Sequence, residues 1–171
     1  MDGLALVPLT EENLPLAQAI DRGDVSGAFV DSADAIWELT RWGQAHGCVG
    51  HTFLVMYTGR CIGLILLGEA IPWASDPPEM AARPFYRLMG FVLDRRYRGR
   101  GLGGQVLEMA IARCFRDFGP RSIALGVHRD NLRAGQFYRR HGFVQTRYME
   151  GDDFYYLKFF DPPNTERYPI S

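Results

Sequence analysis

Cysteines and long hydrophobic runs are scarce in this sequence of 171 residues. The three cysteines, Cys48, Cys61 and Cys114, are odd in number and lack CxxC spacing, which argues against a disulfide framework and a zinc knuckle. The longest strongly apolar run, Cys61–Leu67, is far too short to span a bilayer. The stretch His46–His51 has histidine and cysteine side chains but no fourth ligand nearby, so we predict no metal site.

The amino-terminal residues have neither the positive flank nor the apolar run of a secretory signal, so we expect a cytoplasmic protein. The composition is 47% hydrophobic and 23% charged, which is typical of soluble globular proteins. A chain of this length most economically forms one domain, which we expect to span residues 1–171.

The net charge of −1 hides an uneven distribution of charge along the chain. Residues 1–40 hold eight acidic residues and one arginine, whereas residues 83–147 hold fourteen arginines and four acidic residues. One part of the protein therefore suits a cationic ligand and another part suits an anionic ligand. A nucleic-acid-binding module is the weaker interpretation, because the overall charge is near zero and the arginines spread over several predicted elements. We predict neither a nucleic acid nor a membrane as partner.

The periodicity of apolar residues predicts an α/β domain with the element order βααβββαβαββ. The predicted strands are Leu4–Leu9, Thr52–Tyr57, Cys61–Leu67, Phe85–Asp94, Ser122–His128, Phe143–Tyr148 and Phe154–Phe160. The predicted helices are one with Thr10 as its N-cap, one that begins at Asp31 or Ser32, then Gln105–Phe118 and Asn131–His141.

Three local features add expectations about how these elements pack. The second helix is expected to carry Ile36, Leu39 and Trp42 on one apolar face. The proline-rich segment Ile71–Pro84 is expected to be a loop or a crossover. Gly90 interrupts a strand, and a glycine in that position often marks a bulge or a close backbone approach. We therefore expect the sheet to open at Gly90.

The stretch RGRGLGG, Arg98–Gly104, contains a G-x-G-x-x-G pattern at Gly99, Gly101 and Gly104. A dinucleotide-binding Rossmann unit is disfavoured, because a hairpin precedes the pattern and the five residues Asp94–Arg98 come before the first glycine, which is too slack for the tight turn. A Walker loop fails, because no Lys-Ser or Lys-Thr follows the glycines. Glycines before a helix can still direct backbone N–H groups toward a phosphate, and the neighbouring arginines raise the local potential. From these residues alone, the alternative is a basic helix-capping loop.

Two motifs together resemble the GNAT superfamily of acyl-CoA-dependent N-acetyltransferases. Arg98–Gly103 is similar to its R/Q-x-x-G-x-G/A signature, and Asn131–Phe143 is similar to its N-x-x-A-x-x-x-Y-x-x-x-G-F motif. The resemblance is good over residues 86–143. It implies a mixed central β-sheet flanked by helices, in which two neighbouring parallel strands splay apart and acetyl-CoA lies between them. Gly90 and Gly126, each inside a predicted strand, fit such a splay.

The resemblance also implies the cofactor-binding residues, with acetyl-CoA as the co-substrate. The backbone of Phe91, Val92 and Leu93 is expected to pair with the pantetheine amides and to orient the acetyl carbonyl. Asn131 is expected to contact the cofactor arm, and Tyr138 is expected to lie near the sulfur. The residues implied to cradle the pyrophosphate are Arg98, Gly99, Arg100, Gly101, Leu102, Gly103 and Gly104.

Tyr138 is the expected general acid, because a tyrosine hydroxyl with an ordinary pKa near 10 is a reasonable proton donor to a departing thiolate. The sequence leaves three options for the general base. Some polyamine-acetylating members carry a carboxylate early in the cofactor-binding strand, and that position corresponds to Met89 here. Glu69 and His128, each at the end of a predicted strand, are the substitutes, and a water chain is the third option.

The segment Tyr86–Gly99 looks like the bacterial spermine/spermidine acetyltransferase branch, which implies a polyamine or a similar small primary amine as acceptor. In the family, the first two helices and the last hairpin wall the acceptor cleft, and acidic residues there would concentrate a cationic amine. Those acidic residues are Asp21, Asp24, Asp31, Asp34, Glu38, Glu150, Asp152 and Asp153. Acetylation of a protein N-terminus and a non-catalytic acyl-CoA-binding sensor are the alternatives, and a homodimer is a common assembly in the family.

Overall fold

The structure is a computed structural model that describes residues 3–23, 27 and 29–160. Its element order confirms the predicted α/β arrangement and adds a short helix and a 3-10 turn. The strands are β1 (Leu4–Pro8), β2 (Gly50–Tyr57), β3 (Arg60–Glu69), β4 (Phe85–Leu93), β5 (Ser122–His128), β6 (Val144–Glu150) and β7 (Asp153–Lys158). The helices are α1 (Leu14–Gln18), α2 (Ala33–Ala45), α3 (Pro78–Ala81), α4 (Leu102–Phe118) and α5 (Leu132–Arg140), with the 3-10 turn η1 at Arg95–Tyr97.

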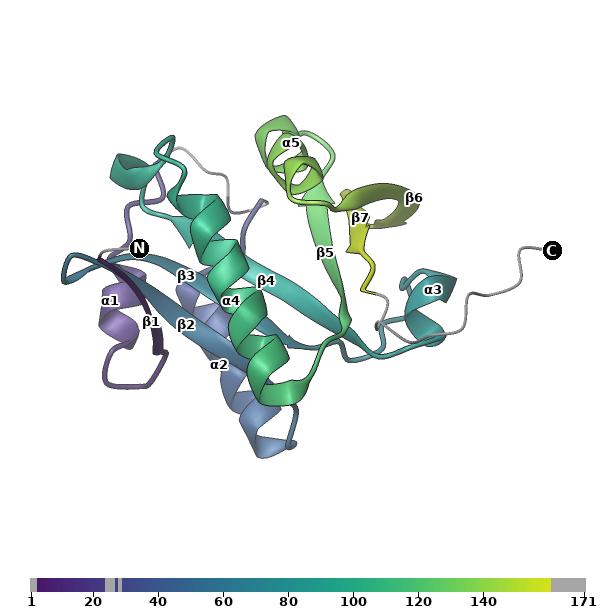
Figure 1. Cartoon of the computed structure of the whole chain (residues 1–171), viewed down its shortest axis with the longest axis horizontal. Helices are drawn as coiled ribbons and strands as arrows, with labels where there is room; N and C mark the ends of the chain where they lie inside the picture. Colours follow the sequence, from purple (N-terminus) through teal and green to yellow (C-terminus); the bar gives the residue numbers. More distant parts are fainter. Residues whose placement is uncertain (1–2, 24–26, 28, 161–171) are drawn as a thin grey trace.

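The seven strands form one mixed sheet in the order β1-β2-β3-β4-β5-β7-β6. Each neighbouring pair is antiparallel except β4 and β5, which are parallel. These two strands pair only from Phe85 opposite Ser122 to Arg87 opposite Ala124. Beyond Arg87 they diverge, as Figure 1 shows, and this confirms the splayed central sheet.

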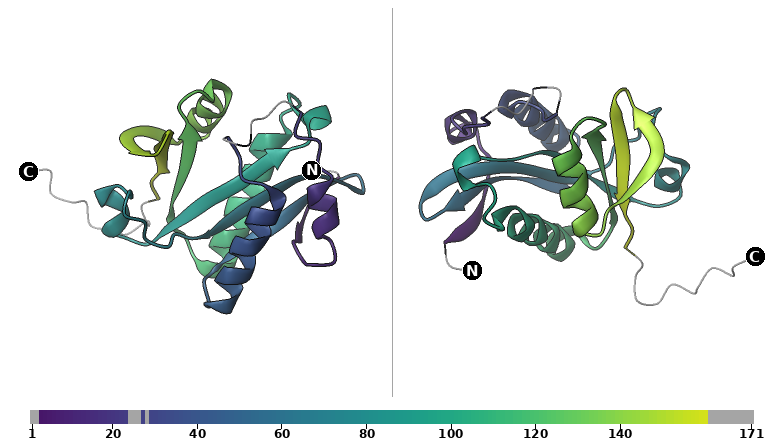
Figure 2. Two further views of the ribbon diagram at one scale, coloured as in Figure 1. Left: turned by 180° about the vertical axis from the view of Figure 1, so that it is seen from behind. Right: turned by 90° about the horizontal axis from the view of Figure 1, so that it is seen from above.

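Helices cover both faces of the β1 to β4 part of the sheet, as Figure 2 shows. Strand β2 directs Phe53 and Val55 into the core beneath α4, whereas the intervening Leu54 packs in the core of α1 and α2. Alternate side chains of a strand point to opposite faces, so a strand that is covered on both sides is apolar throughout. Helix α4 contributes an apolar stripe to the first core, with Val106 and Leu107 fully buried. Within the described ranges, no helix combines the length and the apolarity needed to cross a bilayer.

Three expectations about helices need correction. Helix α1 begins at Leu14 and not directly after Thr10, because the Thr10 amide donates to Asn13 Oδ1 (2.7 Å) and the Asn13 amide donates to Thr10 Oγ1 (3.2 Å), which forms a separate turn. Helix α2 does begin after an N-cap at Ser32, but Leu39 and Trp42 are exposed. The helix turns Ile36 and Thr40 toward the sheet instead, where Thr40 Oγ1 lies 2.7 Å from Thr52 Oγ1 of β2. The proline-rich crossover includes the short helix α3.

Candidate active site

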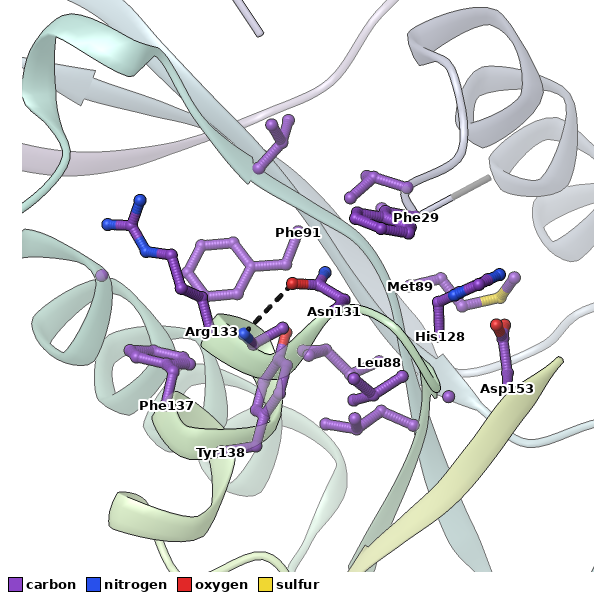
Figure 3. Close-up of a pocket in the computed structure, with 18 of the residues that line it drawn as sticks. Phe29, Leu88, Met89, Phe91, His128, Asn131, Arg133, Phe137, Tyr138 and Asp153 are labelled. Atoms are coloured by element: carbon purple, nitrogen blue, oxygen red, sulfur yellow. Dashed lines mark hydrogen bonds between the residues drawn. The ribbon is translucent and has the colours of Figure 1, made fainter. Parts of the chain in front are cut away.

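A cleft of about 1210 Å³ opens where β4 and β5 diverge. Its walls come from β4, the turn between η1 and α4, β5, α5, the β6–β7 turn and the segment before α2. Figure 3 shows side chains from these elements directed toward one another across the gap. The site is therefore assembled from segments that lie far apart in the sequence.

Strand β4 provides one wall of this cleft. Leu64 pairs with Val92 and Leu66 pairs with Met89, so β4 contains one extra residue opposite β3, which is a β-bulge. Gly90 lies in the bulge with φ +63°, a backbone conformation that favours glycine. On the β5 side, β4 has no strand partner beyond Arg87 within the described residues, and Phe91, Val92 and Leu93 line the cleft there. The sheet opens near Gly90, as the sequence predicts.

The glycine-rich turn lies at one end of the cleft. Gly101 is the N-cap of α4 with φ +74°, Gly99 has φ +75°, and added Cβ atoms at either position would meet open space. The first N–H groups of the 17-residue helix α4 therefore have no side-chain cap from Gly101 and are available to an anion. Gly103 faces Phe137 of α5 and Gly104 faces His141, so these two glycines allow α4 and α5 to approach.

The arginines of this turn have different environments. Arg98 lines the cleft, but its Nε donates to the Leu93 carbonyl (3.0 Å) and its Nη2 donates to the Arg22 carbonyl (2.7 Å). Its guanidinium therefore ties the end of β4 to the segment after α1. Arg100 is exposed and lies over the Tyr97 ring, and Leu102 is buried in the core; neither is among the described cleft-lining residues.

Helix α5 provides Asn131 and Tyr138 to the opposite wall. Asn131 is the N-cap of α5, and its Oδ1 accepts the Ala134 amide (3.3 Å), the bond drawn in Figure 3. The Tyr138 ring packs edge-on against Phe137 and Phe143, and its hydroxyl end points into the cleft. Burial raises the pKa of the Tyr138 hydroxyl above its ordinary value near 10, so the side chain holds its proton at neutral pH.

The two candidate bases are not brought together. Glu69 ends β3 opposite Tyr86, at the far end of β4, and it is not one of the described residues that line the cleft. His128 ends β5 inside the cleft, next to the Phe29 ring, with ring centroids 5.0 Å apart. Its Nδ1 accepts the Asp130 amide (3.1 Å), which places the proton of the neutral ring on Nε2. In this arrangement His128 presents a donor to the cleft.

Four carboxylates line the other end of the cleft: Asp31, Glu150, Asp152 and Asp153. Asp153 is half-buried and the other three are exposed. Burial raises the pKa of Asp153, His128 opposes this shift, and the charges of Asp31 and Asp152 add to it. Burial also raises the pKa of Glu150, with Arg87 opposing and Asp153 adding. This end of the cleft therefore has a negative potential that attracts cations.

The remaining acids of the predicted acceptor wall lie elsewhere or outside the described residues. Asp21 pairs with Arg95 (3.0 Å), and Asp34 accepts a hydrogen bond from Gln18. Asp34 and Glu38 are exposed on α2, and neither is among the cleft-lining residues that the structure describes. Asp24 lies outside the described residues.

The cleft residues that escaped the sequence prediction include Trp73, Arg87 and Tyr155. Trp73 belongs to the proline-rich crossover, whose sequence predicts a loop but not which part of the fold the loop contacts. Arg87 lies within an apolar strand pattern, and a charged residue in such a pattern is a signal of a buried functional or structural pair.

Comparison with known proteins gives one family and a set of similar folds. The sequence profile described as the acetyltransferase (GNAT) family matches residues 18–143. No curated protein sequence is significantly similar to the chain. The PaiA N-acetyltransferase from Thermoplasma acidophilum in complex with coenzyme A is 19% identical, with a TM-score of 0.67 over 92% of this chain and 99% of that one.

Two further solved structures have the same fold. An acetyltransferase from Thermus thermophilus is 20% identical, with a TM-score of 0.67 over 92% of this chain and 97% of that one. The NatC complex bound to Gag peptide and CoA contains a chain that is 19% identical, with a TM-score of 0.63 over 93% of this chain and 99% of that one. At these identities the likeness is one of fold.

Proposed function

The chain belongs to the GNAT family of acetyltransferases, and we propose that it transfers the acetyl group of acetyl-CoA directly to the primary amine of a small cationic acceptor. The observation that carries this proposal is the cleft between β4 and β5, which has a helix N-terminus behind a glycine turn at one end and four carboxylates at the other. The first end suits a pyrophosphate and the second suits an ammonium group.

The cofactor end of the cleft matches the chemistry of acetyl-CoA. Backbone groups of Phe91, Val92 and Leu93 face the cleft, where an extended pantetheine arm can add to the edge of β4 as a further strand does. The pyrophosphate would lie on the N–H groups of α4 after Gly101. The similar PaiA fold was solved with coenzyme A, which supports this assignment. Arg98 then acts by holding the end of β4, through its bonds to two carbonyl groups.

The transfer joins the acceptor nitrogen to the acetyl carbon and breaks the bond between that carbon and sulfur. The attacking amine must be neutral, and it loses a proton as the amide forms. Tyr138 protonates the departing sulfur, and its raised pKa keeps the hydroxyl protonated until then. After coenzyme A has formed, the Tyr138 phenolate regains a proton from solvent.

The amine proton leaves toward the end of the cleft that holds His128 and Asp153, because Glu69 lies outside the described lining. The neutral His128 ring accepts a proton only after it gives up the hydrogen bond from the Asp130 amide. Variants His128→Ala, Asp153→Asn and Glu69→Gln, each measured as kcat/KM against pH, separate these routes. A basic limb that is unchanged in a variant removes that residue as the base.

A thiol-release assay with acetyl-CoA tests the proposal across polyamines, amino acids, aminoglycosides and peptides. We expect turnover of spermidine and related amines, with kcat/KM that falls as the ionic strength rises, because the carboxylates attract the acceptor over a distance. Turnover of neutral amino acids or antibiotics without turnover of spermidine would overturn the acceptor class. Peptide acetylation is the second candidate, because the NatC complex, which has a similar fold, was solved with a bound peptide.

A non-catalytic sensor is separated from the enzyme by a single variant. Tyr138→Phe is expected to bind coenzyme A as the wild type does and to lose most acetyl transfer, because only the hydroxyl is removed. Equal transfer rates in both proteins would show that Tyr138 has no catalytic role, and absence of transfer in the wild type with every amine would favour the sensor.

A further inference from the structure

A buried arginine lies at the point where β4 and β5 part. Arg87 is the last β4 residue that pairs with β5, and its side chain is only 6% exposed. A buried guanidinium is unfavourable unless its charge is paired and its donors are bonded. The groups that satisfy Arg87 therefore show what this part of the fold must hold in place.

The partners of Arg87 come from the crossover between β3 and β4. Nη1 and Nη2 donate to Asp76 Oδ1 (3.2 and 3.1 Å), Nη2 also donates to Asp76 Oδ2 (3.0 Å), and Nη2 donates to the Ile71 carbonyl (2.9 Å). The guanidinium carbon lies 3.6 Å from the centre of the Trp73 ring. Arg87 thus contacts the crossover at Ile71, Trp73 and Asp76, and its guanidinium stacks on the Trp73 ring.

Asp76 also connects Arg87 to other residues of this wall. It accepts the Trp73 amide (2.9 Å) and the Tyr155 hydroxyl (2.8 Å), and the Tyr155 hydroxyl also bonds Ser75 Oγ (2.8 Å). Burial acts to raise the pKa of Asp76, but the hydrogen bonds from Arg87 and Trp73 hold it below the ordinary value. The pair therefore stays charged throughout the neutral range, and the Trp73 ring has a fixed position.

Trp73, Arg87 and Tyr155 line the same cleft as the carboxylates Glu150 and Asp153, and Arg87, on which Trp73 stacks, is close enough to Glu150 for its charge to act on that carboxylate. The Trp73 residue is 36% exposed although Arg87 covers part of its ring. Asp76 offsets part of the Arg87 charge, which reduces its repulsion of a second cation at this wall. An indole surface next to carboxylates is suited to an aliphatic chain that carries an ammonium group.

We infer that Trp73 is a specificity-determining residue of the acceptor site, where it binds the alkylammonium part of the acceptor, and that Arg87, Asp76 and Tyr155 are its positioning residues. This inference rests on the proposed function, since it concerns the acceptor that the cleft takes. It adds the crossover, a segment outside both sequence motifs, to the acceptor wall.

Steady-state kinetics of Trp73→Ala and Trp73→Phe test the inference, with Trp42→Ala as the matched control on the exposed face of α2. We expect Trp73→Ala to raise the KM of a diamine about tenfold, as loss of one cation–π contact predicts. The KM of acetyl-CoA should stay within about twofold, Trp73→Phe should retain most of the affinity, and Trp42→Ala should resemble the wild type. A monoamine without a second charge should respond less than the diamine.

The positioning residues have their own test. Asp76→Asn should raise the same KM while the KM of acetyl-CoA is unchanged, and Arg87→Lys should fail to preserve affinity because lysine cannot form the two-pronged pair. Circular dichroism and the acetyl-CoA KM identify any variant that has merely misfolded. Acceptor binding should also change the tryptophan fluorescence of the wild type bound to coenzyme A, and Trp73→Phe should abolish that change.

The outcomes separate this inference from the proposed function. If the wild type acetylates peptides and not polyamines, the acceptor class fails, but the Trp73→Ala effect on the KM of the accepted peptide still decides the role of Trp73. An unchanged acceptor KM in Trp73→Ala, or equal rises in the KM values of acceptor and acetyl-CoA, would overturn the inference. If no amine is turned over, the fluorescence titration with spermidine decides it, and an equal signal in the wild type and Trp73→Phe would overturn it.

Discussion

Replacement of Gly90 by alanine tests whether the β4 bulge depends on glycine. Gly90 has φ +63°, and a non-glycine residue in the left-handed region costs about 1–2 kcal/mol. A Cβ atom there would also lie 2.5 Å from Cδ1 and from Cγ1 of Ile36, which is fully buried. Such overpacking costs about 1–3 kcal/mol. The expected loss in the free energy of unfolding is therefore about 2–5 kcal/mol.

Urea unfolding of the wild type and four variants measures the steric and the backbone contributions separately. Gly59→Ala is the control for the backbone contribution, because Gly59 has φ +81° in the β2–β3 turn and an added Cβ meets open space. Gly90→Ala should exceed Gly59→Ala by about 1–3 kcal/mol. In an Ile36→Ala background that excess should disappear, because the overlapping atoms are gone. An equal effect of Gly90→Ala in both backgrounds would refute the steric reasoning.

The same substitution should also affect the cofactor site. Gly90 precedes Phe91, whose backbone faces the cleft, and relief of the overlap with Ile36 requires movement of the bulge. We expect a higher KM for acetyl-CoA in Gly90→Ala and no change in Gly59→Ala. An unchanged KM in a destabilised Gly90→Ala protein would show that the bulge does not position the cofactor-binding strand.

Three further predictions concern the acid, a buried carboxylate and the glycine turn. Tyr138→Phe should lower kcat by roughly 10²–10⁴-fold, the usual contribution of general acid catalysis, with unchanged coenzyme A affinity by calorimetry; a loss below twofold would contradict the assignment. Asp94 is 1% exposed, and hydrogen bonds from Arg96 and from the Asp21 amide hold its pKa well below the ordinary value. The ionised carboxylate therefore stabilises the folded protein above about pH 4, and this stabilisation is lost as the pH falls toward the folded pKa. Asp94→Asn should therefore lower the unfolding free energy by about 1–3 kcal/mol at pH 7, and the difference from the wild type should shrink below pH 4, whereas a difference that is independent of pH would show that the Asp94 charge is not its source. Gly104→Ala should raise the KM of acetyl-CoA, because the added Cβ lies 2.6 Å from His141 Cε1, and His141→Ala should restore it; no restoration would point to another cause.

Local patterns predicted much of the fold. Apolar runs and the turn residues between them located all seven strands, and the helix over residues 105–118 and the cap at Ser32 followed from spacing and side-chain chemistry. Gly90 was recognisable because a glycine offers a strand no side chain to pack, so its presence there indicates an irregular backbone. The buried face of α2 was not predictable, since burial of Leu39 and Trp42 depends on which side of the helix is turned to the sheet, and that side carries Ile36 and Thr40.

The sequence by itself determined the family, the element order and the glycine turn, because these depend on residues close together in the chain. Only the tertiary structure decided which side chains share the cleft. The strand order carried Glu69 to the far end of β4, the Arg98 guanidinium bonds to the Arg22 carbonyl, and Arg87 stacks on Trp73, which lines the cleft. Each of these contacts joins residues whose proximity depends on sheet topology and on the pairing of buried charges, which no local spacing records.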